Sequence, residues 1–415
     1  MANNLLKQKW RKLDNTAKIF SMEDYTNNNT FRLSVVLKEK VNPSYLKDAV
    51  IRTLIDYPSY KVKIRAGFFW NYFEKNDNDV IIEEESEMPC QSINFVMNND
   101  YLFKVTYFDK KINVDMCHML TDGMGGVIFI KSIIYNYLNI VKDMNLKVED
   151  KYYDAGYGRD QYLRRYDKSM FSVEKSKHIF LINDKYDIDI NKTYHYIIEV
   201  DTFKSVCRKY DVSVTVLLTT LYVMALYNTV YDKNSNRDIY INVPVDMRKH
   251  FNVYAFSNFF TCMDIKSNVN IGEVSFDKIL NQIKGEFANK LKIENLKGYL
   301  SRDVKLGNNV AIRLVPLFIK KPVMKILEKV VRRSTTTMSN IGIFKVDERY
   351  EKYIDNVLVV VNPGNIQKVK CTVCSYKNKL NVTINSNLID DKFELEFNRL
   401  LEEYIGKIKV ESNVN

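Results

Sequence analysis

His118 and Asp122 are the residues whose types and spacing suit acid–base catalysis. Gly123 follows them directly and opens a glycine-rich loop. A histidine side chain has an ordinary pKa of about 6.5, so its neutral imidazole can accept a proton near neutral pH. Such a base can deprotonate a hydroxyl or an amine while that group attacks a carbonyl carbon. Three of the 13 glycines lie at Gly123, Gly125 and Gly126, where we expect a ligand to approach the backbone closely. The alternative is a hydrogen-bonded histidine at a strand end, followed by glycines that only form a turn.

The segments around His118 predict the elements that position it. Residues 101–116 form two alternating runs around Asp109, which indicates a strand pair that delivers the chain to the histidine. Apolar residues at three- and four-residue spacing follow as far as Val141, which indicates a helix. The order is therefore strand, tight loop and helix, and the sheet is expected to hold the histidine rigidly.

The pattern His118-x-x-x-Asp122-Gly123 resembles the active-site signature of the acyl-CoA-dependent acyltransferases related to chloramphenicol acetyltransferase, condensation domains and plant BAHD enzymes. Other segments are similar to the same superfamily and occur in the same order. They are Tyr57 to Trp70, typical of the early strand pair of microbial alcohol acetyltransferases; Asn242-Val-Pro-Val-Asp-Met-Arg248; Asn258-Phe-Phe; and the Ser-Asn-x-Gly turn at Ser339-Asn340-Ile341-Gly342.

This resemblance implies a fold and a set of site residues. The fold class is α/β, with two chloramphenicol-acetyltransferase-like mixed-sheet sandwich halves and a tunnel between them. His118 is implied as the general base, Asp122 as a structural residue paired with Arg248, and Gly123 as room for the thioester. The implied binding residues for acyl-CoA and substrate are Gly125, Gly126, Asn258, Thr337, Ser339 and Asn340.

The same resemblance implies an O-acyltransferase that moves an acyl group, expected to be acetyl, from acyl-CoA to an alcohol in a ternary complex. Acyl-CoA is a cosubstrate, no bound cofactor or metal is expected, and the acceptor is a small alcohol or amine. Cys117 replaces the first histidine of the condensation-domain motif, and the BAHD Asp-Phe-Gly-Trp-Gly segment is absent, which favours the alcohol acetyltransferase branch. Two alternatives stay open: a non-catalytic protein that binds a hydrophobic ligand, and a membrane-surface enzyme acting on a lipid or amine.

The length of 415 residues and an apolar content of 46% predict a globular protein of two or three domains. We expect an N-terminal half at 1–165, a crossover linker at 166–190 and a C-terminal half at 191–415. The uncharged run 212–231 is as long as a membrane span, but its threonines and flanking aspartates favour a buried core helix.

Most of the formal net charge of +11 lies in residues 294–333, which contain ten basic and three acidic residues. The apolar residues between them indicate a basic amphipathic helix broken by Pro316 and Pro322. Three interpretations remain: a surface for the phosphates of CoA, attachment to an anionic membrane, or a solvated helix face. No nucleic-acid-binding motif accompanies the charge, so we expect no nucleic-acid partner, and membrane contact is not the leading expectation.

The six cysteines form no regular framework, and the first 20 residues lack the apolar stretch of a secretory signal. We therefore expect a cytoplasmic protein, and we expect a monomer. Cys371 and Cys374 lie in a predicted strand and have no second pair, so a metal site is not expected. The other histidines, His178, His195 and His250, are expected on the surface.

Overall fold

The computed structural model describes residues 9–22, 29–146, 160–170, 178–270, 272, 274–323 and 334–414. Its named strands form three sheets. The five-stranded sheet has the order β12 (Ile354–Val361), β2 (Thr30–Leu37), β7 (Lys111–Cys117), β6 (Phe103–Phe108), β5 (Ile82–Glu84). Its neighbours are antiparallel except for β5 and β6, which are parallel.

A seven-stranded sheet forms the core of the C-terminal half. Its order is β10 (Phe260–Ser267), β9 (Ile239–Asp246), β11 (Thr336–Ile343), β13 (Val369–Tyr376), β14 (Lys379–Ser386), β8 (Lys192–Glu199), β15 (Lys409–Ser412). β11 runs parallel to both β9 and β13, and the other neighbours are antiparallel. The sheet is therefore mixed.

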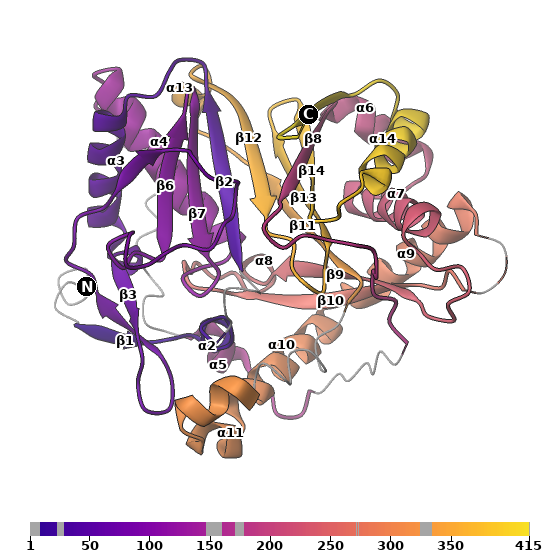
Figure 1. The fold of residues 1–415 in the computed structure, drawn as a ribbon, viewed down its shortest axis with the longest axis horizontal. Helices are drawn as coiled ribbons and strands as arrows, with labels where there is room; N and C mark the ends of the chain where they lie inside the picture. The colour runs from indigo at the N-terminus through magenta and orange to yellow at the C-terminus, as the bar shows by residue number, and fades with distance from the viewer. Residues whose placement is uncertain are drawn as a thin grey trace.

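Helices cover the outer faces of the two large sheets (Figure 1). On the five-stranded sheet these are α3 (Pro43–Asp56) and α4 (Gly123–Val141). On the seven-stranded sheet they are α6 (Val200–Lys209), α7 (Val214–Thr229), α9 (Phe276–Lys290) and α14 (Lys392–Ile405). Two hydrophobic cores result, one beneath each helical layer.

The two halves are interlocked by β12, which comes from the C-terminal half yet pairs with β2 of the N-terminal sheet (Figure 1). Polar side chains on the inner face of the seven-stranded sheet bond to β12: Thr372 donates to the Val359 carbonyl (2.6 Å), and Asn381 donates to the Val357 carbonyl (3.0 Å). The sequence division at residues 165 and 191 therefore does not separate two independent sheets.

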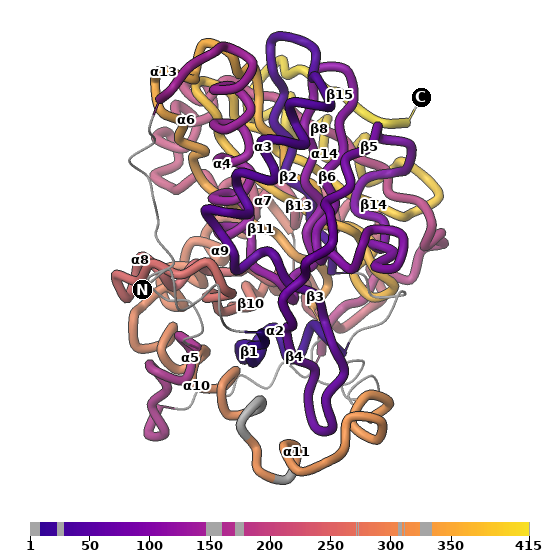
Figure 2. The backbone as a smooth tube through the Cα atoms, turned by 90° about the vertical axis from the view of Figure 1, so that its left-hand side faces the viewer, coloured from indigo at the N-terminus to yellow at the C-terminus, as the bar shows by residue number. Residues whose placement is uncertain are grey.

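A small antiparallel sheet lies at one end of the molecule, where most of the remaining helices also lie (Figure 2). Its order is β1 (Trp10–Lys12), β4 (Tyr72–Lys75), β3 (Val62–Arg65). The helices are α2 (Asn15–Phe20), α5 (Gln161–Arg165), α8 (Arg248–Phe251), α10 (Ile293–Asn308) and α11 (Val310–Leu314); the short α13 (Glu348–Glu351) lies near the opposite end. Both views place α11 beside the β3–β4 hairpin.

Local sequence signals explain the elements next to the site. The turn between β6 and β7 has Asp109 at a φ of 47°, a left-handed conformation that aspartate tolerates. α4 starts at Gly123 because the Asp122 side chain accepts a hydrogen bond from the Gly125 amide at 3.0 Å. α4 is long and apolar enough to cross a membrane by length and composition, but it packs within the N-terminal core.

Most of the expected elements are present, including the hairpin, the helix after His118 and the buried helix within 212–231, which is α7. The predicted Ser-Asn-x-Gly turn is wrong, and the described helix 317–323 runs through Pro322, where a break was expected. Ser339 to Gly342 do not form a free turn: they lie within β11, where a bulge between Asn340 and Gly342 shifts the register against β13. Part of the basic segment, 324–333, lies outside the described residues.

Candidate active site

His118 lies one residue beyond the end of β7, and its backbone is held from two sides. Its amide donates to the Asn29 carbonyl at 3.0 Å, and its carbonyl accepts from the Asn258 side chain at 3.0 Å. Asn258 is fully buried and precedes β10 of the C-terminal half. The residue expected to bind substrate thus has a visible positioning role, because it fixes the histidine from across the junction of the halves.

Three phenylalanines surround the His118 ring. Phe20 of α2 stacks on it with a centroid distance of 5.0 Å, Phe31 of β2 lies at 4.7 Å, and Phe260 of β10 lies at 6.2 Å. Nδ1 is buried and has no hydrogen-bond partner among the described residues, while the residue as a whole keeps partial exposure. Nε2 is therefore the ring nitrogen that a ligand can reach.

This environment controls the protonation of His118. Burial disfavours the charged imidazolium and lowers the pKa of His118 to about 4; the carboxylate of Asp122 opposes this shift, and the charge of Lys370 adds to it. The imidazole is consequently neutral at pH 7, the form that accepts a proton.

Asp122 and Arg248 form a buried ion pair across the two halves, with 2.9 Å between Oδ1 and Nη2. The second carboxylate oxygen, Oδ2, accepts from the Phe259 amide at 2.8 Å. The guanidinium also donates to Asp246 (2.9 Å) and to the carbonyls of Ala255 and Ser257 (2.8 Å each). Asp122 therefore points at Arg248 and at the backbone of the C-terminal half, and no bond from it to the imidazole is present among the described residues.

The three loop glycines differ in what surrounds them. A Cβ at Gly125 would lie 1.9 Å from the Thr121 hydroxyl, and one at Gly126 would lie 2.8 Å from the Phe31 ring. Both glycines are buried, and a Cβ at Gly125 would also lie 2.5 Å from the Phe256 carbonyl of the C-terminal half, so close packing requires a glycine at each position. The ligand contact expected from the sequence stays a prediction. Gly123 is partly exposed and faces the Ile341 side chain of β11, so it lies where the halves meet.

The residues expected on β11 point to two different sides of the sheet. Asn340 donates to Thr215 of α7 at 2.9 Å, and its Oδ1 accepts from the Gly342 amide at 2.8 Å. The Asn340 side chain is thus turned to the helical layer, and its role in binding substrate stays a prediction. Thr337 and Ser339 alternate with it and face the opposite way; the Thr337 hydroxyl donates to Gln367 at 2.8 Å.

Sequence reasoning missed Asp14, Phe20 and Phe31. Asp14 caps α2 through the Ala17 amide at 2.7 Å, and its other oxygen accepts from Asn258 at 3.4 Å. Burial raises the pKa of Asp14 to about 7. No local pattern marks these residues, since only the tertiary fold brings α2 and β2 to the histidine.

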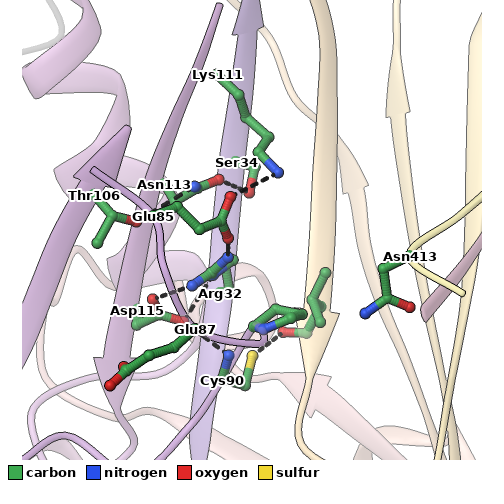
Figure 3. A network of polar contacts seen from close by, with 12 residues as sticks. Arg32, Ser34, Glu85, Glu87, Cys90, Thr106, Lys111, Asn113, Asp115 and Asn413 are labelled. Carbon is green, nitrogen blue, oxygen red and sulfur yellow. Dashed lines mark hydrogen bonds and ion pairs between the residues drawn. The ribbon is translucent and has the colours of Figure 1, made fainter. Parts of the chain in front are cut away.

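A separate polar network lies on the inner face of the N-terminal sheet (Figure 3). Arg32 of β2 forms two bonds with the Asp115 carboxylate, at 2.8 and 2.7 Å, and also contacts Glu85, which pairs with Lys111 at 3.1 Å. Cys90 Sγ lies 3.4 Å from the Val360 carbonyl of β12, so the network reaches the interlocking strand.

Burial lowers the pKa of His195 of β8 to about 4, and the charge of Lys111, across the halves, adds to this shift. His195 is half-buried, and its Nδ1 lies 2.9 Å from the Thr383 hydroxyl. The expectation that His195 lies on the surface is wrong, because its strand faces the N-terminal half; His178 and His250 are exposed as expected.

No protein-family model matches the sequence, and no curated protein sequence is similar to it. Solved structures with the same fold include F. graminearum TRI101 complexed with coenzyme A and deoxynivalenol, with a TM-score of 0.66, 10% identity, and coverage of 97% of this chain and 99% of that chain. For TRI3 trichothecene 15-O-acetyltransferase from Fusarium sporotrichioides the TM-score is 0.60 and the identity is 10%, with coverage of 95% of this chain and 94% of that chain. For the epimerization domain from the third module of tyrocidine synthetase B the TM-score is 0.58 and the identity is 11%, with coverage of 95% of each chain.

At such low identity the likeness shows the fold, and it does so over nearly the whole chain. The expected fold class is confirmed: the chain has the two-half mixed α/β architecture shared by these acetyltransferases and domains of peptide synthetases. The tunnel and the roles of the individual site residues stay predictions.

The Asp122→Asn variant should lose about 3 kcal/mol of unfolding free energy, because it leaves the buried Arg248 guanidinium with less negative charge around it. The matched control is Asp355→Asn, which removes a carboxylate from an exposed pair with Lys379 and should cost less than about 1 kcal/mol. Urea unfolding followed by circular dichroism measures both. Equal losses in the two variants would contradict the structural role of Asp122.

Proposed function

We propose that this protein is an acyltransferase that moves an acyl group, acetyl in the first instance, from acyl-CoA to the hydroxyl of an acceptor. The observation that carries the proposal is the neutral His118 ring, held at the junction of the halves by residues from both. The fold gives further support, because TRI101 of the same fold is solved with coenzyme A and deoxynivalenol. Acyl-CoA is proposed as a cosubstrate.

The reaction proceeds by direct attack within a ternary complex. Nε2 of His118 takes the proton of the acceptor hydroxyl as the acceptor oxygen bonds to the thioester carbonyl carbon. The tetrahedral intermediate then collapses, the carbon–sulfur bond breaks, and the imidazolium returns its proton to the CoA thiolate. His118 ends neutral, so one proton moves from acceptor to CoA and no covalent enzyme intermediate forms.

The surrounding residues divide the remaining work. Asp122 and Arg248 fix the loop that carries His118, and the negative charge of Asp122 favours the transient imidazolium without touching it. Gly123 keeps the start of α4 open beside the thioester. Ser339, on the face of β11 away from α7, is proposed to donate to the oxyanion, whereas the Thr337 hydroxyl is already used by Gln367.

His118→Ala should lower turnover by at least about 100-fold while the protein stays folded, because a general base contributes about 10²- to 10⁴-fold. The assay is thiol release from acetyl-CoA across a panel of alcohols, amines and glycolipids. His250→Ala, which removes an exposed imidazole, is the matched control and should keep full activity.

Near-normal turnover of the His118→Ala variant would contradict the role of His118 as the general base. If the wild-type protein releases no thiol with any acceptor, yet binds a hydrophobic ligand, the non-catalytic alternative replaces the proposal. The expected products on alcohols are esters, and preferential product formation on amines would change the assignment to N-acylation.

A second candidate is an enzyme that works on a lipid acceptor at a membrane surface. We define the apolar tip as Phe68, Phe69, Leu314, Phe318 and Ile319, at the β3–β4 hairpin and around α11. Phe68, Leu314 and Phe318 are 69%, 66% and 73% exposed, and the Leu317 amide donates to the Phe68 carbonyl at 2.8 Å, so the two segments lie together. The exposed Arg313 and Lys321 flank the tip, and apolar groups beside basic ones are typical of an interfacial surface.

Co-sedimentation with vesicles of phosphatidylcholine and phosphatidylglycerol tests this candidate. The Phe68→Ser/Phe318→Ser variant keeps every charge and should lose most of the bound fraction, because exposed rings contribute through apolar burial in the interface. Its control is Ile51→Ser/Ile55→Ser, which removes two exposed apolar side chains of α3. No binding by the wild-type protein, or equal losses in both variants, would exclude a role for the tip.

A further inference from the structure

A cavity of about 500 Å³ lies between β1, the β3–β4 hairpin, α2 and α11. This volume is within the range of sites for small molecules. Its polar and charged lining is Lys12, Lys18, Arg313 and Asn71, and its rings are Trp10, Trp70 and Tyr72. These side chains come from four separate segments of the chain, so the folded protein assembles the cavity.

The aromatic part of the lining is unusual for this chain. Trp10 and Trp70 are its two tryptophans, and both line this one cavity. The Trp10 and Tyr72 rings meet edge to face with centroids 6.1 Å apart, which leaves ring faces for other contacts. Flat ligands such as a nucleobase or a sugar ring stack on faces of this kind.

The charged part of the lining is entirely positive. Lys18 Nζ lies 5.8 Å from the centroid of the Trp70 ring, and Lys320 Nζ lies 3.5 Å from it. Lys320 is only 2% exposed and donates to the Phe69 carbonyl at 2.7 Å. Within the described ranges, none of the four cations Lys12, Lys18, Arg313 and Lys320 forms an ion pair. This cationic cluster therefore has no counter-ion bonded to it in the described part of the chain.

The nearest acids do not neutralise the cluster. Burial lowers the pKa of Lys18, and the charges of Asp160 and Asp14 oppose this shift. Neither acid lines the cavity, and burial raises the pKa of both. Glu74 lies on the same small sheet and is paired with Arg65 (3.0 Å) and Lys63 (3.5 Å). Burial lowers the pKa of Lys320 to about 8, and the positive charge of Lys18 adds to this shift.

We infer that this cavity is a binding site for a phosphorylated ring compound, a nucleotide or a sugar phosphate. Lys12, Lys18 and Arg313 hold the phosphate, since guanidinium and ammonium groups form strong charge-assisted bonds with phosphate oxygens. The ring stacks on Trp10, Trp70 or Tyr72. A neutral ligand of the same shape lacks the contacts that offset the mutual repulsion of the cations.

The cavity is connected to the proposed catalytic centre through α2. Lys18 lines the cavity, and Phe20, two residues further along the same helix, stacks on His118. The same short helix therefore contributes a cation to the cavity and a ring contact to the histidine. Assigning a ligand in the cavity as a substrate group, either the nucleotide end of acyl-CoA or a phosphorylated acceptor, rests on the proposed function; the binding itself does not.

Intrinsic tryptophan fluorescence tests the inference directly, because both tryptophans report on this cavity. The full chain is titrated at constant ionic strength with adenosine 3′,5′-bisphosphate, with glucose 6-phosphate, and with adenosine and glucose as unphosphorylated partners. At least one phosphorylated probe should change the emission saturably and bind at least about ten-fold more tightly than its unphosphorylated partner. No saturable change with either phosphate would overturn the inference.

A matched pair of variants separates the site from general surface charge. Lys12→Glu/Arg313→Glu reverses two charges in the cavity and should weaken binding by at least about ten-fold. Lys47→Glu/Arg52→Glu makes the same change on the exposed face of α3 and should leave binding unchanged. Equal weakening in both variants would show non-specific attraction and would overturn the inference.

The choice of probe identifies the source of the phosphate. Saturable binding of adenosine 3′,5′-bisphosphate assigns the cavity to the nucleotide end of CoA, and preference for glucose 6-phosphate assigns it to a phosphorylated acceptor. His118→Ala should bind either probe as the wild type does. If the probes bind but no acyl transfer occurs, only the proposed function is overturned. If acyl transfer occurs but no probe binds, only the cavity assignment is overturned.

Discussion

The buried ion pair between Asp122 and Arg248 is the interaction on which the rest of the site depends. One carboxylate caps the start of α4, accepts from the Phe259 amide and binds a guanidinium whose other donors hold the loop before β10. The start of the main N-terminal helix and the β9–β10 region of the C-terminal half are therefore fixed to the same group. His118 lies four residues before this carboxylate, so its place between the halves follows from the pair.

The polarity of the junction follows from that arrangement. Because Asp122 is committed to Arg248, the His118 ring receives no carboxylate partner from the described residues and is instead enclosed by three phenylalanines. An apolar enclosure keeps the imidazole neutral, whereas a directly bonded carboxylate would favour the charged form. The site thus separates two tasks, since the ion pair holds the geometry and the aromatic enclosure holds the protonation state.

Local sequence patterns predict the secondary structure on either side of His118. The strand before His118, the helix after it and the buried helix α7 follow from alternation, capping and apolar spacing. The pairing of Asp122 with Arg248 came only from resemblance, and the structure places the two in contact. Tertiary packing decided the rest: spacing could not show that Gly126 fits against Phe31, that Asn340 turns to α7, or that β12 crosses to the other sheet.

We conclude that the fold keeps His118 neutral over the pH range in which it acts as a base. Nuclear magnetic resonance of ¹³C-labelled histidine measures this directly, since the chain has four histidines and the His118→Ala variant assigns the relevant signal. We expect a His118 signal that is constant from pH 8 to about pH 5 and titrates with a midpoint near pH 4. A midpoint near the ordinary histidine value of about 6.5 would contradict it.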